Sequence, residues 1–421
     1  MDDRFLAYKI LSKIERDKAY SNIAVDTVLS QNEVSSAPFV RALVYGVIER
    51  KITLDYYLSQ LLAQPIKKLN PQVLTILRMG AYQIKFMDKI PVSAAVNESV
   101  KLSKKVKCGF ASGLINSVLR KFASTEIEFP ETDNRMYDLS IKYSCPESLA
   151  NHFVKDYGYI KAEEILKASI GEVPLYLRVN TLRITATELV KCLADEGVTA
   201  KACENDSVIE VIDGGQVFKT DAYKKGYFHA QDLASHKCIS SLAPEKNDVI
   251  FDMCAAPGGK SFTMAEIMEN KGSIHSFDLY DHKIKLISEG AKRLGIKIIN
   301  AQIGDASKFN PDLPKADKIL CDVPCAGLGV IRRKPEIKYK DFGFIDKLCE
   351  LQYNILNNAS LYLKDKGVLM YSTCSLSKNE NEEVCKRFLD EHKDFKNGGM
   401  VTLFPSNNGS DGFFYAKLIR E

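Results

Sequence analysis

The sequence predicts a multidomain protein with an all-α bundle, a small α+β domain and a C-terminal α/β domain built on a doubly wound parallel sheet. Three observations support this fold class. The chain has 421 residues, which is too long for one compact core. Its first part carries apolar residues at helical spacing. Its last part repeats short apolar strands separated by helix-length segments.

Residues 1–126 are predicted to form the all-α bundle. Apolar residues recur along one helical face between residues 54 and 62, and they are Leu54, Tyr57, Leu58, Leu61 and Leu62. Pro65, Pro71 and Pro91 fall between such segments, where helices start or stop. Several short helices that each carry one apolar face can bury those faces against one another, which predicts a bundle.

Residues 130–232 are predicted to form the small α+β domain. The stretch 174–183 alternates in the manner of a half-buried strand. A helix capped by Thr185 or Thr187 is expected to follow, and residues 206–212 then form another strand. This order of strand, helix and strand indicates a separate small module.

Residues 233–421 are predicted to form the α/β domain. Five apolar strands are expected at 248–254, 273–279, 297–305, 316–325 and 367–375, with a further strand at 412–420. Segments of helix length separate the first five. Such alternation is typical of a parallel sheet with helices on both faces.

The composition is that of an ordinary soluble protein, with 45% hydrophobic residues, 27% charged residues and a net charge of +4. This charge permits nucleic-acid binding without requiring it. No apolar run is long enough to span a membrane, and the first residues lack a signal-peptide core, so we expect a cytoplasmic protein. The 11 cysteines contain no C-x-x-C pair and the six histidines form no cluster, so we expect no metal.

The ends of the first three strands of the α/β domain carry a glycine-rich turn and two acids. In open α/β sheets, ligands bind beyond the carboxyl ends of the strands. The turn Asp252–Ser261, "DMCAAPGGKS", lets the backbone approach a ligand closely. Asp278 stands where an acid commonly takes ribose hydroxyls, and Asp305 is placed to reach an adenine edge. Each feature alone is also common in ordinary loops, but together they predict a pocket for an adenosine-containing cofactor.

The fourth and fifth strands each end at a cysteine. Cys325 closes the sequence Asp322-Val323-Pro324-Cys325, and Cys374 closes Ser372-Thr373-Cys374. In the usual strand order these two strands lie beside the first, so both thiols are expected to flank one cleft. Most other cysteines of the chain are interpreted as small buried apolar residues.

The motifs "DMCAAPGGK", "DVPCAG" and "YSTCS" together resemble the RNA cytosine-C5 methyltransferases of the bacterial 16S rRNA type, the RsmB/Sun family. The resemblance covers nearly the whole chain. The helical part is similar to the NusB-like RNA-binding domain of that family in "LRMGAYQIKF", "PVSAAVNESVKLSKK" and "INSVLR", and the small domain is similar to its linker domain in "YLRVNTLR" and "AQDLAS". The last domain would then be a Rossmann-like methyltransferase.

The resemblance implies a cofactor, a substrate and a set of roles. The cofactor is S-adenosylmethionine, held by Asp278, Asp305, Asp322 and the loop Cys254, Ala255, Ala256, Pro257, Gly258, Gly259 and Lys260. Cys374 is the nucleophile that adds to C6 of the cytosine, because a thiolate adduct makes C5 reactive. Cys325 assists release, and Asp322 holds the base. The family's usual serine is Ala326 here, a departure that removes no group the mechanism needs.

The substrate implied by the resemblance is 16S rRNA, at the cytosine conventionally numbered 967. The basic stretch "IRRKPEIKYK" follows the Cys325 loop directly, so Arg332, Arg333 and Lys334 are candidates for holding phosphates. The target cytosine would have to leave any base stack to reach Cys374. We expect a monomer without membrane or metal partners.

Three other functions remain open from the sequence. The same chemistry could act on tRNA or on another rRNA position, although the NusB-like start favours the small-subunit substrate. A noncatalytic RNA-binding factor could keep the fold as a scaffold, but both cysteines and the cofactor loop are intact. An exocyclic amine methyltransferase usually carries an N/D-P-P-Y/F loop where this chain has Asp322–Cys325, and that chemistry needs no thiol.

Overall fold

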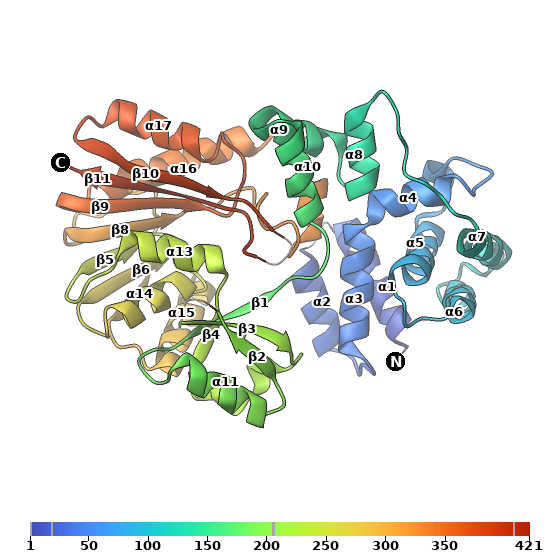
Figure 1. Ribbon diagram of the computed structural model, residues 1–421, viewed down its shortest axis with the longest axis horizontal. Coiled ribbons are helices and arrows are strands. Elements are labelled where there is room, and N and C mark those ends of the chain that lie inside the picture. Colours follow the sequence, from blue (N-terminus) through green and yellow to red (C-terminus); the bar gives the residue numbers. More distant parts are fainter. Residues whose placement is uncertain (1, 18–19, 204–206, 407–408) are drawn as a thin grey trace. The chain divides into compact units, whose positions relative to one another are not determined.

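The computed structural model describes residues 2–17, 20–203, 207–406 and 409–421 (Figure 1). The described chain divides into two compact units. The first contains residues 1–170 and 331–340, and the second contains residues 171–330 and 341–421. The three domain boundaries expected from the sequence stay a prediction.

The first unit is helical, and up to residue 126 this is what its apolar pattern predicts. Its α-helices are α1 (Asp3–Asp17), α2 (Ser21–Ser30), α3 (Ala37–Glu49), α4 (Lys51–Ser59), α5 (Pro71–Phe86), α6 (Val92–Lys105), α7 (Ser112–Ser124), α8 (Arg135–Tyr143), α9 (Glu147–Tyr157) and α10 (Tyr159–Ala168). Pro71 is the first residue of α5 and Pro91 is the N-cap of α6, so both prolines mark helix starts as expected. The Asn70 side chain accepts a hydrogen bond from Gln72 N and so caps α5.

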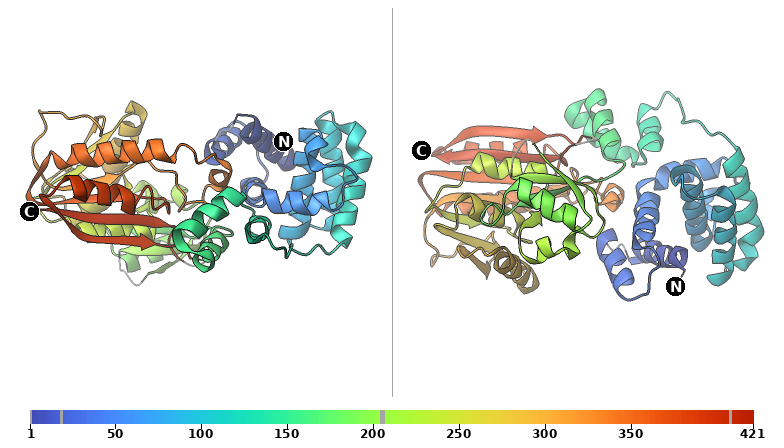
Figure 2. Two further views of the ribbon diagram at one scale, coloured as in Figure 1. Left: turned by 90° about the horizontal axis from the view of Figure 1, so that it is seen from above. Right: turned by 60° about the horizontal axis from the view of Figure 1, so that its bottom comes forward.

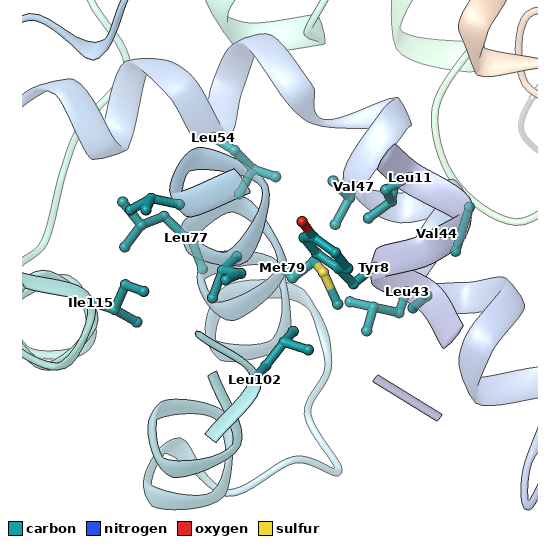
Figure 3. Packing of buried hydrophobic residues seen from close by; sticks show 14 of the residues in the cluster. Tyr8, Leu11, Leu43, Val44, Val47, Leu54, Leu77, Met79, Leu102 and Ile115 are labelled. Atoms are coloured by element: carbon teal, nitrogen blue, oxygen red, sulfur yellow. The ribbon is translucent and has the colours of Figure 1, made fainter. Parts of the chain in front are cut away.

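The core of the helical unit joins most of its helices through apolar side chains. Tyr8 and Leu11 from α1, Leu43 from α3 and Leu77 from α5 point into one cluster (Figure 3). Leu54 of α4 is fully buried in the same cluster, as its place on the apolar face predicts. Burial of such side chains supplies the main free energy that holds short helices together.

The segment Ile331–Lys340 belongs to the helical unit, although the sequence on both sides of it belongs to the second unit. It forms the short 3-10 helix η4 (Pro335–Tyr339). Buried Lys338 donates to the backbone oxygen of Glu49 at 2.7 Å, and the Tyr339 hydroxyl donates to Ile48 O at 2.7 Å. The Ser21 hydroxyl donates to Glu336 at 2.7 Å. These contacts fasten the segment to α2 and to the end of α3.

The second unit begins with a small antiparallel sheet. Its strands are β1 (Leu175–Val179), β2 (Thr199–Ala202), β3 (Val208–Asp213) and β4 (Phe228–Ala230), in the order β2-β3-β1-β4. Helix α11 (Ala186–Asp195) follows β1, and Thr185 caps it in a capping box with Glu188, which confirms one of the two predicted caps. Asp206, expected at the start of the second strand, lies outside the described residues.

Within the part of the chain that the structure describes, the large sheet of the second unit has seven strands in the order β10-β11-β9-β8-β5-β6-β7. They are β5 (Val249–Asp252), β6 (Ser273–Asp278), β7 (Ile299–Ile303), β8 (Ala316–Asp322), β9 (Leu363–Thr373), β10 (Phe395–Leu403) and β11 (Phe413–Arg420). Strands β5 to β9 pair in parallel, whereas β11 pairs antiparallel with both β9 and β10. The predicted fold class is confirmed, with an antiparallel edge added to the parallel sheet.

Helices cover both faces of the large sheet, which Figure 2 shows from two further directions. Helices α13 (Leu233–Leu242), α14 (Gly259–Ile267) and α15 (Asp281–Leu294) pack on one face. Helices α16 (Ile345–Ser360) and α17 (Glu382–Glu391) pack on the other. Strand β8 lies directly between β5 and β9, so the carboxyl ends of these three strands are adjacent. None of the helices in the described ranges is long and apolar enough to cross a membrane.

Candidate active site

The glycine-rich turn between β5 and α14 is held against neighbouring strands. Met253 N donates to Leu320 O at 2.9 Å, and Ala255 N donates to Phe277 O at 2.8 Å. Gly258 has a φ of +110°, and a Cβ there would lie 2.4 Å from the ring of Phe262. Glycine is therefore required at this position by both backbone conformation and space.

A buried acid lies beneath this turn. Asp252, the last residue of β5, is 1% exposed and accepts a hydrogen bond from the Ser261 hydroxyl at 2.6 Å. Burial raises the pKa of Asp252 to about 7. Ser261 lies in the first turn of α14, so this bond ties the end of the strand to the start of the helix.

An open pocket of about 240 Å³ lies beyond the carboxyl ends of the parallel strands. Its wall includes the predicted cofactor residues Cys254, Ala256, Asp278, Asp305 and Asp322. Three carboxylates from the ends of β6, β7 and β8 thus meet at one pocket. Of the remaining loop residues, Ala255 and Gly258 are buried, Gly259 and Lys260 are half-buried, and Pro257 is exposed.

Asp278 and Asp305 are both anchored within their own loops. Asp278 accepts from Leu279 N at 2.8 Å and lies 3.1 Å from Lys283 Nζ. Asp305 accepts from the Ser307 hydroxyl at 2.6 Å, and this bond, with a contribution from Lys308, lowers the pKa of Asp305. Both acids therefore present fixed acceptors to the pocket.

Asp322 connects the pocket to the fourth and fifth strand ends. Its carboxylate accepts from Lys260 Nζ at 2.6 Å and from the Ser372 hydroxyl at 2.8 Å. Burial alone would lower the pKa of Lys260, but the Asp322 carboxylate outweighs that effect and raises it. Lys260 is thus a permanent cation that keeps Asp322 in place.

The two thiols predicted to flank one cleft are in contact. Cys325 Sγ lies 3.2 Å from Cys374 Sγ, and both side chains are half-buried. The hydrogen bond with Cys374 and the burial of Cys325 together raise the pKa of the Cys325 thiol well above its ordinary value. Cys325 is therefore held as a neutral thiol beside the second sulfur.

The three basic candidates for RNA contact belong to the segment fastened to the helical unit. Arg332 is 6% exposed, Arg333 is half-buried and Lys334 is exposed. An RNA contact by any of the three stays a prediction. Within the described ranges, no group of three or more His, Cys, Asp or Glu side chains is arranged to hold a metal ion.

Sequence reasoning missed the buried polar residues behind the site, namely Asp252, Ser261, Ser372, Gln352 and Glu380. Asp252 stands at a strand end, a position that could have singled it out. Glu380 and Asn381 match the family's pattern after the T-C-S motif, but the resemblance assigns neither of them a role. The burial of Glu380 follows from the way the loop after β9 folds back.

Comparison with known families covers most of the chain. The family described as 16S rRNA methyltransferase RsmB/F matches residues 239–419, and the NusB family matches residues 1–124. The ferredoxin-like domain of RsmF/B-like methyltransferases matches residues 145–215. The three matches follow the order of helical, small and α/β parts predicted from the sequence.

Curated relatives and solved structures agree with these matches. The probable ribosomal RNA small subunit methyltransferase B of Bacillus subtilis is 34% identical over 99% of this chain and 98% of its own length. A protein described in the same words from Synechocystis is 31% identical, with the same coverage of both chains. The crystal structure of NSun6 from Pyrococcus horikoshii with SFG superposes with a TM-score of 0.60 at 26% identity, covering 65% of this chain and 98% of that one. The chain therefore belongs to the RsmB/F family of 16S rRNA methyltransferases.

Proposed function

We propose that this protein transfers a methyl group from S-adenosylmethionine to C5 of a cytosine in 16S rRNA. The observation that carries the proposal is the contact of two thiols, 3.2 Å apart, at the ends of adjacent strands. Asp322 joins this pair to the pocket, because it lies in the pocket wall and three residues before Cys325. The family membership supports rRNA methylation. The choice of C5 rests on the thiols.

The residues around the pocket fit S-adenosylmethionine. The cofactor carries a sulfonium and an ammonium, and the wall supplies the carboxylates of Asp278, Asp305 and Asp322. Carboxylates also accept hydrogen bonds from ribose hydroxyls and from an amino group of adenine. The glycine-rich turn brings backbone close to the pocket. When bound, the cofactor supplies an electrophilic methyl group.

Cys374 is assigned the nucleophilic role. C5 of cytosine is too poor a nucleophile to take a methyl group directly. When the Cys374 sulfur bonds to C6, the electrons of the C5–C6 double bond shift toward C4 and N3. C5 then becomes the nucleophilic carbon of an enamine. Asp322 is assigned to hold the edge of the base near N3 and to favour this redistribution of charge. Lys260 and Ser372 fix its carboxylate for that purpose.

Cys325 is assigned to the release step. After methyl transfer, the C5 proton leaves to solvent, the C5–C6 double bond forms again, and the Cys374 sulfur departs from C6. A neutral thiol at 3.2 Å can hydrogen-bond to the departing sulfur and stabilise it as a leaving group. The raised pKa of Cys325 keeps that proton available.

The target is proposed to be cytosine 967 of the 16S rRNA. A duplex would hide C6 of the base, so the cytosine must be unstacked and turned into the site. Bisulfite mapping of RNA treated with the protein and S-adenosylmethionine should then report one protected cytosine at that position.

The covalent step can be tested by trapping it. Cys325→Ala protein is incubated with unmodified 16S rRNA and S-adenosylmethionine and run on a denaturing gel. Because the release group is missing, we expect a protein–RNA adduct that survives denaturation. The adduct should disappear when Cys374→Ala is added. Cys192→Ala, which removes a half-buried thiol from α11, is the matched control and should turn over without an adduct.

Each other outcome rejects a specific part of the proposal. No adduct with an active wild-type protein would remove Cys325 from the release step. Full activity of Cys374→Ala, with the methyl group on the exocyclic amine, would favour the thiol-independent reaction. Methylation of tRNA but not of 16S rRNA would change the substrate. Binding without methylation would favour a noncatalytic factor.

A further inference from the structure

A fully buried carboxylate lies behind the two thiols. Glu380, in the loop after β9, is 0% exposed. Its Oε1 accepts from Ala326 N at 2.8 Å and from Gln352 Nε2 at 3.0 Å. Its Oε2 accepts from the Ser375 hydroxyl at 2.5 Å. All three donors are neutral groups, so the carboxylate is satisfied by hydrogen bonds rather than by a cation in these contacts.

The donors are placed symmetrically about the thiols. Ala326 directly follows Cys325, and Ser375 directly follows Cys374. One carboxylate therefore holds the residue after each sulfur-bearing residue. Both acceptor oxygens belong to one rigid carboxylate. The two loops therefore cannot separate without breaking a buried hydrogen bond.

Two amide side chains complete the arrangement. Gln352 Nε2 also donates to Pro324 O at 2.9 Å, so Cys325 is held on both sides. Asn381, next to Glu380, accepts from the Thr373 hydroxyl at 2.6 Å and donates to Ser375 O at 3.0 Å. Cys374 is thus held on both sides as well.

We propose that Glu380, supported by Gln352 and Asn381, is a positioning residue that sets the separation of the Cys325 and Cys374 thiols. It touches neither sulfur in the contacts described above, and it acts through Ala326 and Ser375. The catalytic consequence rests on the proposed function, in which the second thiol must reach the first during release. The geometric consequence does not depend on that function.

The experiment measures the separation directly by chemistry. Diamide, an oxidant, takes two electrons and two protons from a pair of adjacent thiols and leaves one S–S bond. In wild type we expect rapid formation of a Cys325–Cys374 disulfide, identified by peptide mass spectrometry. In Glu380→Ala, three buried donors lose their acceptor and the loops drift apart, so the disulfide should form about tenfold more slowly.

Two further variants separate positioning from general damage. Glu380→Gln keeps the shape, and its Oε1 can still accept from Ala326 N and Gln352, so it should restore most of the wild-type rate. Glu383→Ala removes an exposed acid three residues later, in the first turn of α17, and should oxidise as wild type does. If Glu380→Ala does not fold, Gln352→Met takes its place. This variant removes the hydrogen bonds that Gln352 donates to Pro324 O and to Glu380, so it too should oxidise more slowly than wild type.

Turnover supplies the second readout. With the site otherwise intact, Glu380→Ala should lower kcat for methylation by roughly 100-fold, as expected for a misplacement of about 1 Å, and leave the KM for S-adenosylmethionine unchanged. Oxidation of Glu380→Ala at the wild-type rate would overturn the proposal, and so would a wild-type protein that forms no Cys325–Cys374 disulfide. A wild-type protein that forms the disulfide but methylates no RNA would reject the proposed function alone.

Discussion

At the scale of single residues, the site contains charged side chains that are partly buried. Lys260 and Asp322 form an ion pair at 2.6 Å, with side chains that are 15% and 27% exposed. Breaking a pair in this environment costs more than breaking a surface pair, because removal of one partner leaves the other charge poorly solvated. Its role in the proposed reaction is to keep the Asp322 carboxylate in the pocket wall.

Replacement of Lys260 by Met tests this pair. We expect the free energy of unfolding to fall by about 2 kcal/mol and the affinity for S-adenosylmethionine to fall by about tenfold, because Asp322 loses its cation. Urea unfolding and calorimetric titration measure the two quantities. The control is Lys285→Met, which breaks an exposed pair with Asp281 and should leave the free energy of unfolding close to that of wild type. Equal effects of the two substitutions would contradict the argument.

Some residues of the site can be predicted from the sequence and others cannot. Asp278 and Asp305 are predicted from their places at strand ends, and Asp322 from the family resemblance. The structure brings all three to one pocket. Glu380 was not assigned a role, because two of the three groups that donate to it, Ala326 N and Gln352 Nε2, lie far away in sequence. Arg332 is predicted to be a phosphate contact from its charge and from its place directly after the Cys325 loop. Its burial depends on packing that charge does not encode.

At the scale of elements, the turn from β5 into α14 has two glycines with different demands. Gly258 adopts a left-handed conformation with φ of +110° and has the Phe262 ring where a Cβ would be. Gly259 has no such φ, and the nearest contact of a Cβ there would be Ala230 O at 3.9 Å. The motif alone makes the two glycines look alike.

Substitution of each glycine by alanine should separate them. Gly258→Ala should lower the free energy of unfolding by about 2 kcal/mol or more, through strain and through the clash with Phe262, and it should weaken S-adenosylmethionine binding. Gly259→Ala should stay within about 0.5 kcal/mol of wild type. Thermal unfolding with and without the cofactor checks both. A tolerated Gly258→Ala would mean that the turn can adopt another conformation.

The elements themselves were predictable where their pattern was local. Strands β5 to β9 and β11 follow from apolar runs, and Thr185 follows from the preference of threonine for helix N-caps. Strand β10 was missed, because its sequence FKNGGMVTL has little alternation and includes two glycines. It lies at the edge of the sheet, where pairing with β11 rather than propensity makes it a strand.

At the scale of the whole molecule, neither compact unit is one continuous stretch of chain. The helical unit takes in residues 331–340, which leave the second unit shortly after Cys325. Lys338, in this segment, is 1% exposed, and burial lowers its pKa to about 8. Bringing a lysine into this position is therefore unfavourable whenever the lysine must carry its charge.

The pH dependence of this segment has a definite sign. Between pH 8 and 10.5, an unfolded Lys338 stays protonated while the folded one loses its proton, so folding becomes more favourable as pH rises through this window. The gain should approach about 3 kcal/mol. Hydrogen-exchange protection of α3, compared between wild type and Lys338→Met at equal pH, measures this gain. The titration of all other groups contributes equally to both proteins and drops out of the difference. Protection of wild type should rise relative to the variant from pH 7.5 to pH 10, and a constant difference would contradict the assignment.

The place of residues 331–340 also constrains how the protein is made. During synthesis the first 170 residues leave the ribosome early and would ordinarily fold as a unit. Here the partners of the Glu49 and Ile48 carbonyls, Lys338 and Tyr339, are translated much later, after most of the second unit. The helical unit therefore lacks these hydrogen-bond partners while the ribosome makes the intervening chain. Nascent chains stalled before residues 331–340 have left the ribosomal exit tunnel, and chains stalled after they have left it, should differ in protease resistance within their first 170 residues.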